Sequence, residues 1–370
     1  MTIFISIPWF SPAYKAGGPI QSITNLLNNY SNNIEYKIFC SNTDLNNELL
    51  NNIEKDKWIR YNDCTQVWYS SKNSTSKNLK AQVSLLKPDI IFIIGIFSWS
   101  YNIVPLLFCK AKKKILSVRG MLHPGALSQK KIKKRLFLNL LKLVSIKKTT
   151  SFHATDNAEA EYIKKEFGEN ATVHVAGNFG RVMCTSQMLY KEVGILKLIT
   201  IALISPMKNY LLVIDALQNC TANIEYNIYG PIKDTEYWEL CKKQMVLLPS
   251  NIRVQYQGEI KPTEIENALS QNHVFIMPSK SENFGHALIE ALSSGKPIIT
   301  SNATPWNNLL ANKAGINCNA DEHAISNAIN FFAEMNAETY EQFVNGAIQY
   351  ASQKIDSQAL HIQYQQMFSA

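Results

Sequence analysis

The stretch Val274–Ile299 constrains the fold of this chain more than any other. Val274–Met277 is a short apolar run that a Pro-Ser pair stops, which is typical of a buried strand ending in a loop. At 100° per residue the apolar side chains that follow fall on one helix face, and His286, Glu290 and Ser293 fall on the other. A Gly and a Pro end that helix before the next apolar run. The stretch therefore predicts a strand, a helix and a second strand.

The loop Ser279–Gly285 is expected at the carboxyl end of the first of these strands, where open parallel sheets bind ligands. Free amides at the following helix start favour an anion such as a phosphate. Glu282 lies in this loop and Glu290 on the polar helix face, and carboxylates accept strong hydrogen bonds from sugar or ribose hydroxyls. The stretch suits a nucleotide-sugar.

Each glutamate also has a simpler interpretation, which the local pattern leaves open. Glu290 fits a solvated residue on an amphipathic helix, and Glu282 fits a surface residue near a helix start, where negative charge is favoured. The longer run SENFGHALIEALSSGKPIITSNATPW resembles the donor-site motif of retaining glycosyltransferases of family 4. This resemblance favours the functional interpretation.

The resemblance implies an α/β protein of GT-B fold, with two Rossmann-like parallel-sheet domains facing across a cleft. It implies that Glu290 holds the ribose hydroxyls of the donor. Donor contacts are expected from the loop, namely Ser281, Glu282, Asn283, Phe284 and Gly285. The residues expected to act in catalysis are Glu282, Lys208, His123 and Arg119.

A second phosphate-binding pattern surrounds Lys208. The apolar run Leu198–Ile204 predicts a strand, the loop SPMKN follows it, and a helix extends through Leu217. The segment resembles the part of the family that grips the donor diphosphate, and Lys208 matches the family lysine. Leu203 departs from the family, because many members have an arginine there. Arg181 or Lys280, both near the expected cleft in sequence, is expected to assist Lys208 in its place.

A length of 370 residues exceeds what one hydrophobic core usually serves, and 46% hydrophobic residues supply apolar material for two. We predict an acceptor-binding domain over residues 1–178, a linker over 179–195 and a nucleotide-sugar-binding domain over 196–350. A final helix over 351–370 is expected to return to the first domain, as in the resembling fold.

The amino-terminal run Ile3–Ile7 predicts a strand, and a glycine-containing loop follows it. Gly17 and Gly18 precede Pro19, which starts a helix well. The glycines let the backbone approach an acceptor or a donor phosphate, or they serve only the shape of a strand-to-helix turn. The family resemblance favours a ligand-binding loop.

The positive charge of the chain lies in one patch. Residues 90–155 hold 13 of the 37 Lys and Arg residues and no acidic residue. Within Lys112–Lys148 a basic amphipathic helix is predicted over Lys130–Ile146, and such a helix docks on anionic lipid or packs on its sheet with a solvated lysine face. Nucleic-acid binding lacks support, because no recognised nucleic-acid motif accompanies the lysines.

Two further segments, SVRGMLHPGAL and FHATDNAEAEYIKKEFG, resemble the same family. Arg119 and His123 lie in the first, in a loop expected to face the cleft. In the second, His153 is more readily a strand-end histidine than a catalyst, and Thr155 or Asp156 is a candidate helix N-cap. That segment has an entirely structural interpretation.

Further strands and helices are predicted along the chain. The expected strands are Glu35–Ser41, Gln66–Ser70, Asp89–Ile94, Glu225–Gly230 and Ile252–Gly258, and the expected helices are Asp234–Leu247, Thr263–Gln271 and much of His323–Phe368. Ile90–Cys109 has no charge but divides into a strand, a loop and a short helix, so we predict core rather than a membrane span. Trp306 is expected either near the cleft or as a core anchor.

The seven cysteines show no Cys-x-x-Cys spacing, and no cleavable signal opens the chain. We therefore expect a cytoplasmic protein, with peripheral contact to the inner membrane face through residues 110–148. No Asp-x-Asp motif is present, so neither an obligatory metal nor another cofactor is expected.

The expected function is retaining transfer of a sugar from a nucleotide-sugar to a glycan or a lipid-diphosphate-linked acceptor, in surface-polysaccharide or lipopolysaccharide O-antigen synthesis. Two alternatives remain open. One is a nucleotide-sugar epimerase of related fold, and the other is a non-catalytic sugar-binding partner, to which Leu203 gives slight weight.

Overall fold

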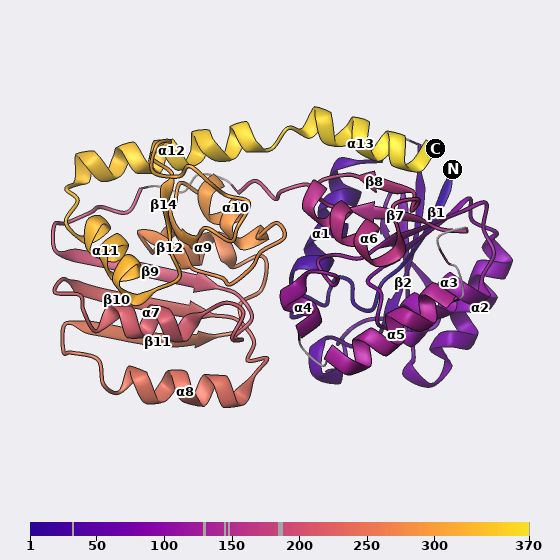
Figure 1. The fold of residues 1–370 in the computed structure, drawn as a ribbon, viewed down its shortest axis with the longest axis horizontal. Helices are drawn as coiled ribbons and strands as arrows, with labels where there is room; N and C mark the ends of the chain where they lie inside the picture. The colour runs from indigo at the N-terminus through magenta and orange to yellow at the C-terminus, as the bar shows by residue number, and fades with distance from the viewer. Residues whose placement is uncertain (32, 129–130, 144–145, 147–148, 184–187, 370) are drawn as a thin grey trace. The chain divides into compact units, whose positions relative to one another are not determined.

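The computed structural model describes the chain except for Asn32, residues 129–130, 144–145, 147–148 and 184–187, and Ala370. It divides into two compact units, each with its own sheet (Figure 1). The first domain comprises Met1–Phe179 and Ser357–Ala370, and the second comprises Gly180–Asp356. The chain therefore leaves the first domain once and ends in it.

The first domain is built on an eight-stranded sheet. Its strands, in order across the sheet, are β3 (Trp58–Asn62), β4 (Thr65–Ser70), β2 (Glu35–Ser41), β1 (Thr2–Ser6), β5 (Ile90–Ile94), β6 (Lys113–Ser117), β7 (Ser151–Ala154) and β8 (Val173–Val175). Neighbouring strands are parallel apart from the antiparallel pair β3 and β4. The sequence did not predict β3, because none of its five residues is buried and it lacks an apolar run.

Both faces of this sheet are buried. Ile3 and Ile5 of β1 belong to a core cluster that includes Tyr364 from the end of the chain. Phe4, between them, belongs to a separate cluster with Ile91 of β5. Because successive side chains point to opposite faces and both faces are covered, the three central residues of β1 are all apolar.

Helices lie on both faces of the first sheet (Figure 1). They are α1 (Gly18–Asn29), α2 (Thr75–Leu86), α3 (Val104–Phe108), α4 (Pro124–Ser128), α5 (Lys131–Leu143), α6 (Asn157–Phe167) and α13 (Ser357–Ser369), with short helical turns η1 (Leu45–Asn47), η2 (Lys72–Ser74) and η3 (Trp99–Ile103). The loop predicted to hold Arg119 and His123 ends at His123, because α4 begins at Pro124. The predicted helix Lys130–Ile146 is described only as α5, and residues at both of its expected ends lie outside the described part.

The uncharged stretch Ile90–Cys109 folds as predicted, into β5, then η3 and α3. Among the helices that the structure describes, none combines the length and the hydropathy that crossing a membrane requires.

The second domain has a six-stranded, parallel sheet. In order across the sheet, the strands are β11 (Ile252–Gly258), β10 (Asn223–Tyr229), β9 (Ile195–Ile201), β12 (Val274–Met277), β13 (Ile298–Ser301) and β14 (Gly315–Cys318). Its helices are α7 (Tyr210–Leu217), α8 (Thr235–Met245), α9 (Ile265–Ser270), α10 (His286–Ser293), α11 (Glu322–Ala333) and α12 (Ala337–Lys354). The predicted strand, helix and strand of Val274–Ile299 is confirmed as β12, α10 and β13.

Strand β9 begins and ends three residues before the predicted strand Leu198–Ile204. Ile204 is fully buried but lies past the strand, where it forms an isolated bridge with Ile232. Its burial explains why the apolar run extends beyond the ladder.

Lys191, within the predicted linker, belongs to the core of the second domain. Its side chain is buried, and Nζ donates to the carbonyls of Glu192 at 2.6 Å, Ala333 at 2.9 Å and Met335 at 3.2 Å. Burial lowers the pKa of Lys191 to about 8. Lys191 thus donates to the carbonyl of Ala333, the last residue of α11, and to that of Met335 just after it. Carbonyls at a helix end have no amide of the next turn to accept from.

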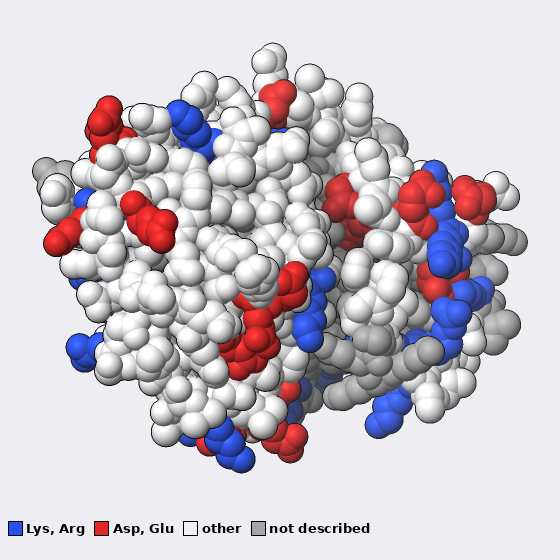
Figure 2. Space-filling model, turned by 60° about the vertical axis from the view of Figure 1, so that its left-hand side comes forward, with Lys and Arg blue, Asp and Glu red and all other residues white. Residues whose placement is uncertain are grey.

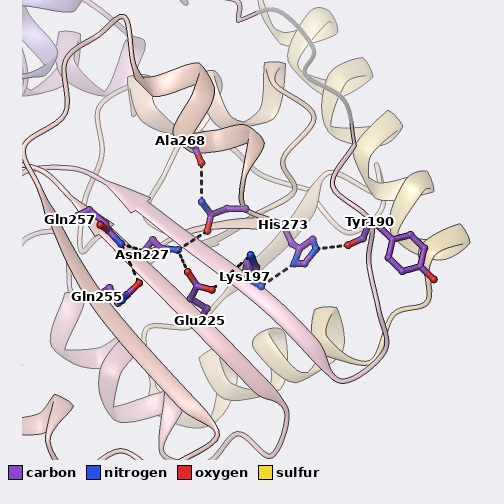
Figure 3. Close-up of polar contacts among 9 residues, drawn as sticks. Tyr190, Lys197, Glu225, Asn227, Gln255, Gln257, Ala268 and His273 are labelled. Atoms are coloured by element: carbon purple, nitrogen blue, oxygen red, sulfur yellow. Dashed lines mark hydrogen bonds and ion pairs between the residues drawn. The ribbon is translucent and has the colours of Figure 1, made fainter.

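Figure 3 shows a polar network on β9, β10 and β11 and beside β12. Asn227 donates to Glu225 at 3.0 Å and to Asn272 at 3.2 Å. His273 lies before β12; its Nδ1 accepts from the Lys197 amide at 2.9 Å, and its Nε2 lies 3.0 Å from the carbonyl of Tyr190. Burial lowers the pKa of His273 to about 4. Since Lys197 and His273 stand at the amino ends of their strands, these two residues lie at the edge of the sheet opposite to the loops described next.

Candidate functional site

Two loops of the second domain follow neighbouring strands. One joins β9 to α7 and the other joins β12 to α10, and β9 and β12 are adjacent in the sheet. The amide of Lys280 donates to the carbonyl of Met207 at 2.9 Å, and Nδ2 of Asn209 donates to the carbonyl of Pro278 at 3.2 Å. The order of strands reverses between β9 and β12, so the loops stand at the crevice where open α/β sheets bind ligands.

Lys208 and Glu282 meet at this crevice. Nζ of Lys208 pairs with Oε1 of Glu282, and Oγ of Ser279 donates to the same oxygen at 2.9 Å. The Lys208 side chain is 21% exposed and the Glu282 side chain 11%. Both side chains are therefore largely buried, so their charges would act on a bound anion with less screening by water than surface charges have.

Both helices that start at these loops begin with a residue of positive φ. Asn209 at the start of α7 has φ 64°, and Gly285 at the start of α10 has φ 76°. A Cβ added to Gly285 would lie 2.9 Å from Cδ1 of Leu288. Gly285 has no side chain to cap α10, so the positive end of this helix faces the loop without a side-chain cap at that position.

The remaining donor-loop residues named from the sequence, Ser281, Asn283 and Phe284, are half-buried. Trp306 is buried, and its Nε1 donates to the carbonyl of Phe284 at 2.5 Å. The amide of Glu282 donates to the carbonyl of Ala303 at 3.1 Å. Trp306 is thus a core anchor that holds the donor loop in place.

Glu290 is not a solvated residue, which corrects the simpler interpretation. It is 3% exposed, and His286 and Ser293 of the same expected polar face are also buried. Oε1 of Glu290 lies 4.0 Å from Nη1 of Arg181. Periodicity could not show this burial, because it separates polar from apolar faces but does not say what covers the polar one.

Arg181 is a cation beside Glu290, one of the residues expected to contact the donor. Its Nη1 also donates to the carbonyl of Pro262 at 3.1 Å. Leu203, where the family arginine is missing, is half-buried. Lys280, the other sequence candidate for that charge, is exposed.

The glycine loop of the first domain is tied down by Asp44, a residue that sequence reasoning missed. Oδ2 of Asp44 accepts from the amides of Tyr14 at 2.9 Å and Lys15 at 3.2 Å. Gly17 has φ 74° and stands at the start of α1, and Gly18 is its first residue. The sequence did contain a sign of this role, because an aspartate shortly after a strand, as Asp44 is after β2, lies where it can accept hydrogen bonds from loop amides.

Arg119 follows β6 and lies mostly in the interior of the first domain. Its Nη1 donates to Oδ1 of Asn178, while Nε and Nη2 are buried without a hydrogen bond to any residue that the structure describes. Burial raises the pKa of the neighbouring Tyr364, and the Arg119 guanidinium partly offsets this rise. Arg119 is therefore a half-buried cation of this loop, held by Asn178.

His123 and His153 both have partners within the first domain. Nδ1 of His123 accepts from the amide of Gly125 at 3.1 Å, and its ring packs edge-on against Tyr162. His153 is fully buried between Oγ of Ser117 and the carbonyl of Ala176, each at 2.8 Å. Burial, with the Arg119 charge second, lowers the pKa of His153 to about 3. The interpretation of His153 as a strand-end histidine is confirmed.

The segment that begins with His153 also organises the Arg119 loop. Asp156 is the N-cap of α6 and accepts from the amide of Glu159. The buried Glu159 carboxylate accepts from the amide of Thr155 at 2.7 Å and from the amide of Gly120. Glu159 thus links the ends of β6 and β7, a role that the sequence did not reveal.

Among the described residues no group of three or more His, Cys, Asp and Glu side chains is arranged to hold a metal ion. Independence from metal remains a prediction.

The second domain is similar in sequence to known proteins. Residues 191–350 match the family model described as glycosyl transferases group 1. A sulfoquinovosyl transferase of Arabidopsis thaliana is 33% identical over 72 residues, which are 20% of this chain and 13% of the length of that relative.

Solved structures match nearly the whole chain. HepE of Anabaena in complex with UDP and glucose has a TM-score of 0.70 at 16% identity, covering 100% of this chain and 99% of its own. A sucrose-phosphate synthase of Thermosynechococcus elongatus has a TM-score of 0.72 at 15% identity, covering 99% and 98%. WaaG, a glycosyltransferase involved in lipopolysaccharide biosynthesis, has a TM-score of 0.67 at 11% identity, covering 100% of both chains.

The fold is that of the GT-B glycosyltransferases, as the sequence predicted. The match to the group 1 glycosyl transferase model lies in the second domain and includes the loops of Lys208 and Glu282.

Proposed function

We propose that this protein is a retaining glycosyltransferase that moves a sugar from a nucleotide-sugar to a glycan or lipid-diphosphate-linked acceptor. The proposal rests on one observation above all: Lys208, Glu282 and Ser279 are gathered where the strand order of the second domain reverses. Two helix starts, those of α7 and α10, stand at the same place. Such a site suits a nucleoside diphosphate.

In this proposal the protein stabilises charge on the leaving group. As the bond between the sugar and the diphosphate breaks, negative charge grows on the phosphate oxygens, and Lys208 and the amides at the start of α10 stabilise it by preorganised electrostatics. Glu282 orients Lys208 and, with the Asn283–Gly285 amides, the donor sugar. Glu290 accepts hydrogen bonds from the ribose hydroxyls, and Arg181 provides the positive charge that Leu203 does not.

The first test is a thermal-shift series of the purified chain with UDP, GDP, ADP and their sugars, beginning with UDP-glucose because HepE was solved with it. A ligand of the native state at about 100 times its Kd adds about 2.7 kcal/mol of stability. NMR of the product then reads the anomeric configuration, and the assay is repeated with EDTA. Inversion at the anomeric carbon would contradict the retaining assignment, and loss of transfer with EDTA would contradict independence from metal.

The same assay separates the two alternatives. An epimerase would change the nucleotide-sugar when no acceptor is present. A non-catalytic partner would bind a sugar or nucleotide without hydrolysing or transferring it. Acceptors drawn from surface polysaccharides or lipopolysaccharide are the first to test, by analogy with WaaG.

We also propose that α5 contacts an anionic membrane from the cytoplasmic side, where a lipid-linked acceptor would be found. Ile132, Leu136 and Leu140 recur every four residues along this helix and are 77%, 61% and 62% exposed. Leu138 and Leu141 on the other face are buried. Figure 2 shows Lys and Arg side chains at the right of the view, with acidic side chains among them. An exposed apolar row beside lysines is typical of a helix that lies in a membrane interface.

Co-sedimentation with vesicles tests this contact. Leu136→Asp should reduce binding to vesicles that contain phosphatidylglycerol, whereas Leu85→Asp, at a leucine that is 76% exposed on α2, should not. Equal binding of both variants would contradict the contact.

A further inference from the structure

The first domain contains a cavity of about 610 Å³. This volume lies within the roughly 300–1,000 Å³ of pockets that bury most of a small ligand. Ile7, directly after β1, and Ile94, at the end of β5, both line it. The strand order of the first sheet reverses between β1 and β5, so the cavity stands at the ligand-binding crevice of its own domain.

Aromatic rings form much of the cavity wall. Trp9, Phe97, Trp99 and Tyr101 all line it. Trp99 is 62% exposed, although an indole of this size is usually largely buried. An exposed aromatic surface in a pocket marks a ligand-binding position, and the C–H face of a sugar ring packs well on such a ring. The wall therefore suits a saccharide.

The cavity is electropositive. Of the twenty residues around it, Lys72 and Arg119 are charged, and both are cations. Lys72 is exposed, while Arg119 is held by Asn178. The starts of α1 and α2 also contribute lining residues, and neither helix has an acidic residue in its first turn. Their positive ends and the two cations favour an anion.

We propose that this cavity binds the acceptor of the transfer reaction, and that the acceptor is a saccharide bearing an oxyanion, a carboxylate or a phosphate, on the unit that enters it. The assignment rests on the proposed function, because only a transferase requires a second substrate. The sugar ring stacks on Trp99, and the oxyanion pairs with Lys72 in the field of Arg119 and the two helix starts. An alkyl chain would gain nothing from these charges.

Titration of the purified full chain with defined probes tests the assignment, followed by tryptophan fluorescence. Methyl glucuronide supplies a carboxylate, glucose 6-phosphate a phosphate, and methyl glucoside neither. At least one anionic probe should bind about tenfold tighter than methyl glucoside at low salt, and the preference should decline steeply towards 1 M salt. Which anion binds better distinguishes a uronic-acid acceptor from a phosphorylated one.

Two variants and two matched controls locate the binding. Trp99→Ala should weaken all three probes about fivefold or more, whereas Tyr190→Ala, at an aromatic ring that is 74% exposed in the second domain, should leave them unchanged. Lys72→Gln should reduce the preference for the anionic probe about threefold, and Lys80→Gln, at an exposed lysine outside the cavity lining, should not. Melting temperatures confirm that each variant is folded.

Three results would overturn the inference. The first is equal affinity for charged and uncharged probes, and the second is an equal effect of Trp99→Ala and Tyr190→Ala. The third is that octyl glucoside binds far tighter than methyl glucoside and that Trp99→Ala removes this gain.

UDP titration and a transfer assay on the same wild-type preparation keep the two proposals apart. If UDP binds and transfer occurs without preference for an anionic acceptor, only the inference fails. If neither occurs while the anionic probe binds, the proposed function fails and with it the acceptor role.

Discussion

The two domains share one architecture but use the carboxyl edges of their sheets differently. At the reversal between β9 and β12, side chains of opposite charge meet, with Lys208 paired to Glu282 and Glu282 also held by Ser279. At the reversal between β1 and β5 lies a cavity with aromatic walls, exposed at Trp99. The same strand arrangement thus supports a charged, compact site in one domain and an open, aromatic one in the other, because the loops rather than the strands carry the chemistry.

The largest expected effect breaks the charged site. Lys208→Ala should lower the turnover of sugar transfer about 100-fold or more, because it removes a cation that acts on charge developing in the transition state. Steady-state kinetics with the donor identified by thermal shift measure it. Lys261→Ala, at an exposed lysine of the same domain, is the control. Unchanged turnover with an altered melting temperature would mean that Lys208 is structural.

A smaller loss is expected at Glu290. Glu290→Gln keeps the shape of this buried side chain but removes the charge that strengthens its hydrogen bonds, so the Kd of the donor nucleotide should rise about tenfold. Calorimetric titration measures the Kd, and circular dichroism should remain native in both Glu290→Gln and Glu290→Ala. Full donor affinity in either variant would refute the ribose role.

Acid should destabilise both domains through one buried histidine each. His153 and His273 have pKa values lowered to about 3 and about 4, below the ordinary 6.5. Each is neutral when folded, so its stabilising effect is complete above pH 6.5 and is lost as the pH falls towards the lowered value. Each group should contribute a slope of at most about 1.4 kcal/mol per pH unit to the free energy of unfolding.

Calorimetry of His153→Gln and His273→Gln from pH 7 to 4.5 can sharpen the comparison between domains. Each variant should flatten the pH dependence of one thermal transition, that of the domain in which the histidine lies. The slope, not the absolute stability, is the measurement, since each substitution also disturbs hydrogen bonds. Slopes equal to that of the wild type in both variants would contradict the assignment.

The smallest effect concerns the donor loop alone. Gly285→Ala should cost about 1–2 kcal/mol more than Gly194→Ala. Both glycines have positive φ, 76° and 81°, but a Cβ at Gly285 would crowd Leu288 whereas one at Gly194 would have nothing within 4 Å. Melting temperatures of the second domain measure the difference. Equal losses would show that the loop relaxes.

Much of the fold was predictable because both sheets are covered on two faces. Strands such as β2 and β5 were predicted to within a residue, since a largely apolar run is the direct record of burial. The edge strand β3 was missed because it has no buried residue, and β9 was placed three residues late because buried Ile204 lies beyond the ladder.

The sequence by itself determined most of the succession of strands and helices along the chain, and which loops follow strand ends. Periodicity and turn residues are local properties, so they can be recognised without the tertiary structure. Only the tertiary structure decided which loops meet: that Lys208 pairs with Glu282 across 74 residues, that Glu290 is buried near Arg181, and that Asp44 holds the glycine loop. It also showed that Arg119 is held by Asn178 and that His153 is fully buried. The reason is physical: partners distant along the chain are chosen by packing, which local sequence does not encode.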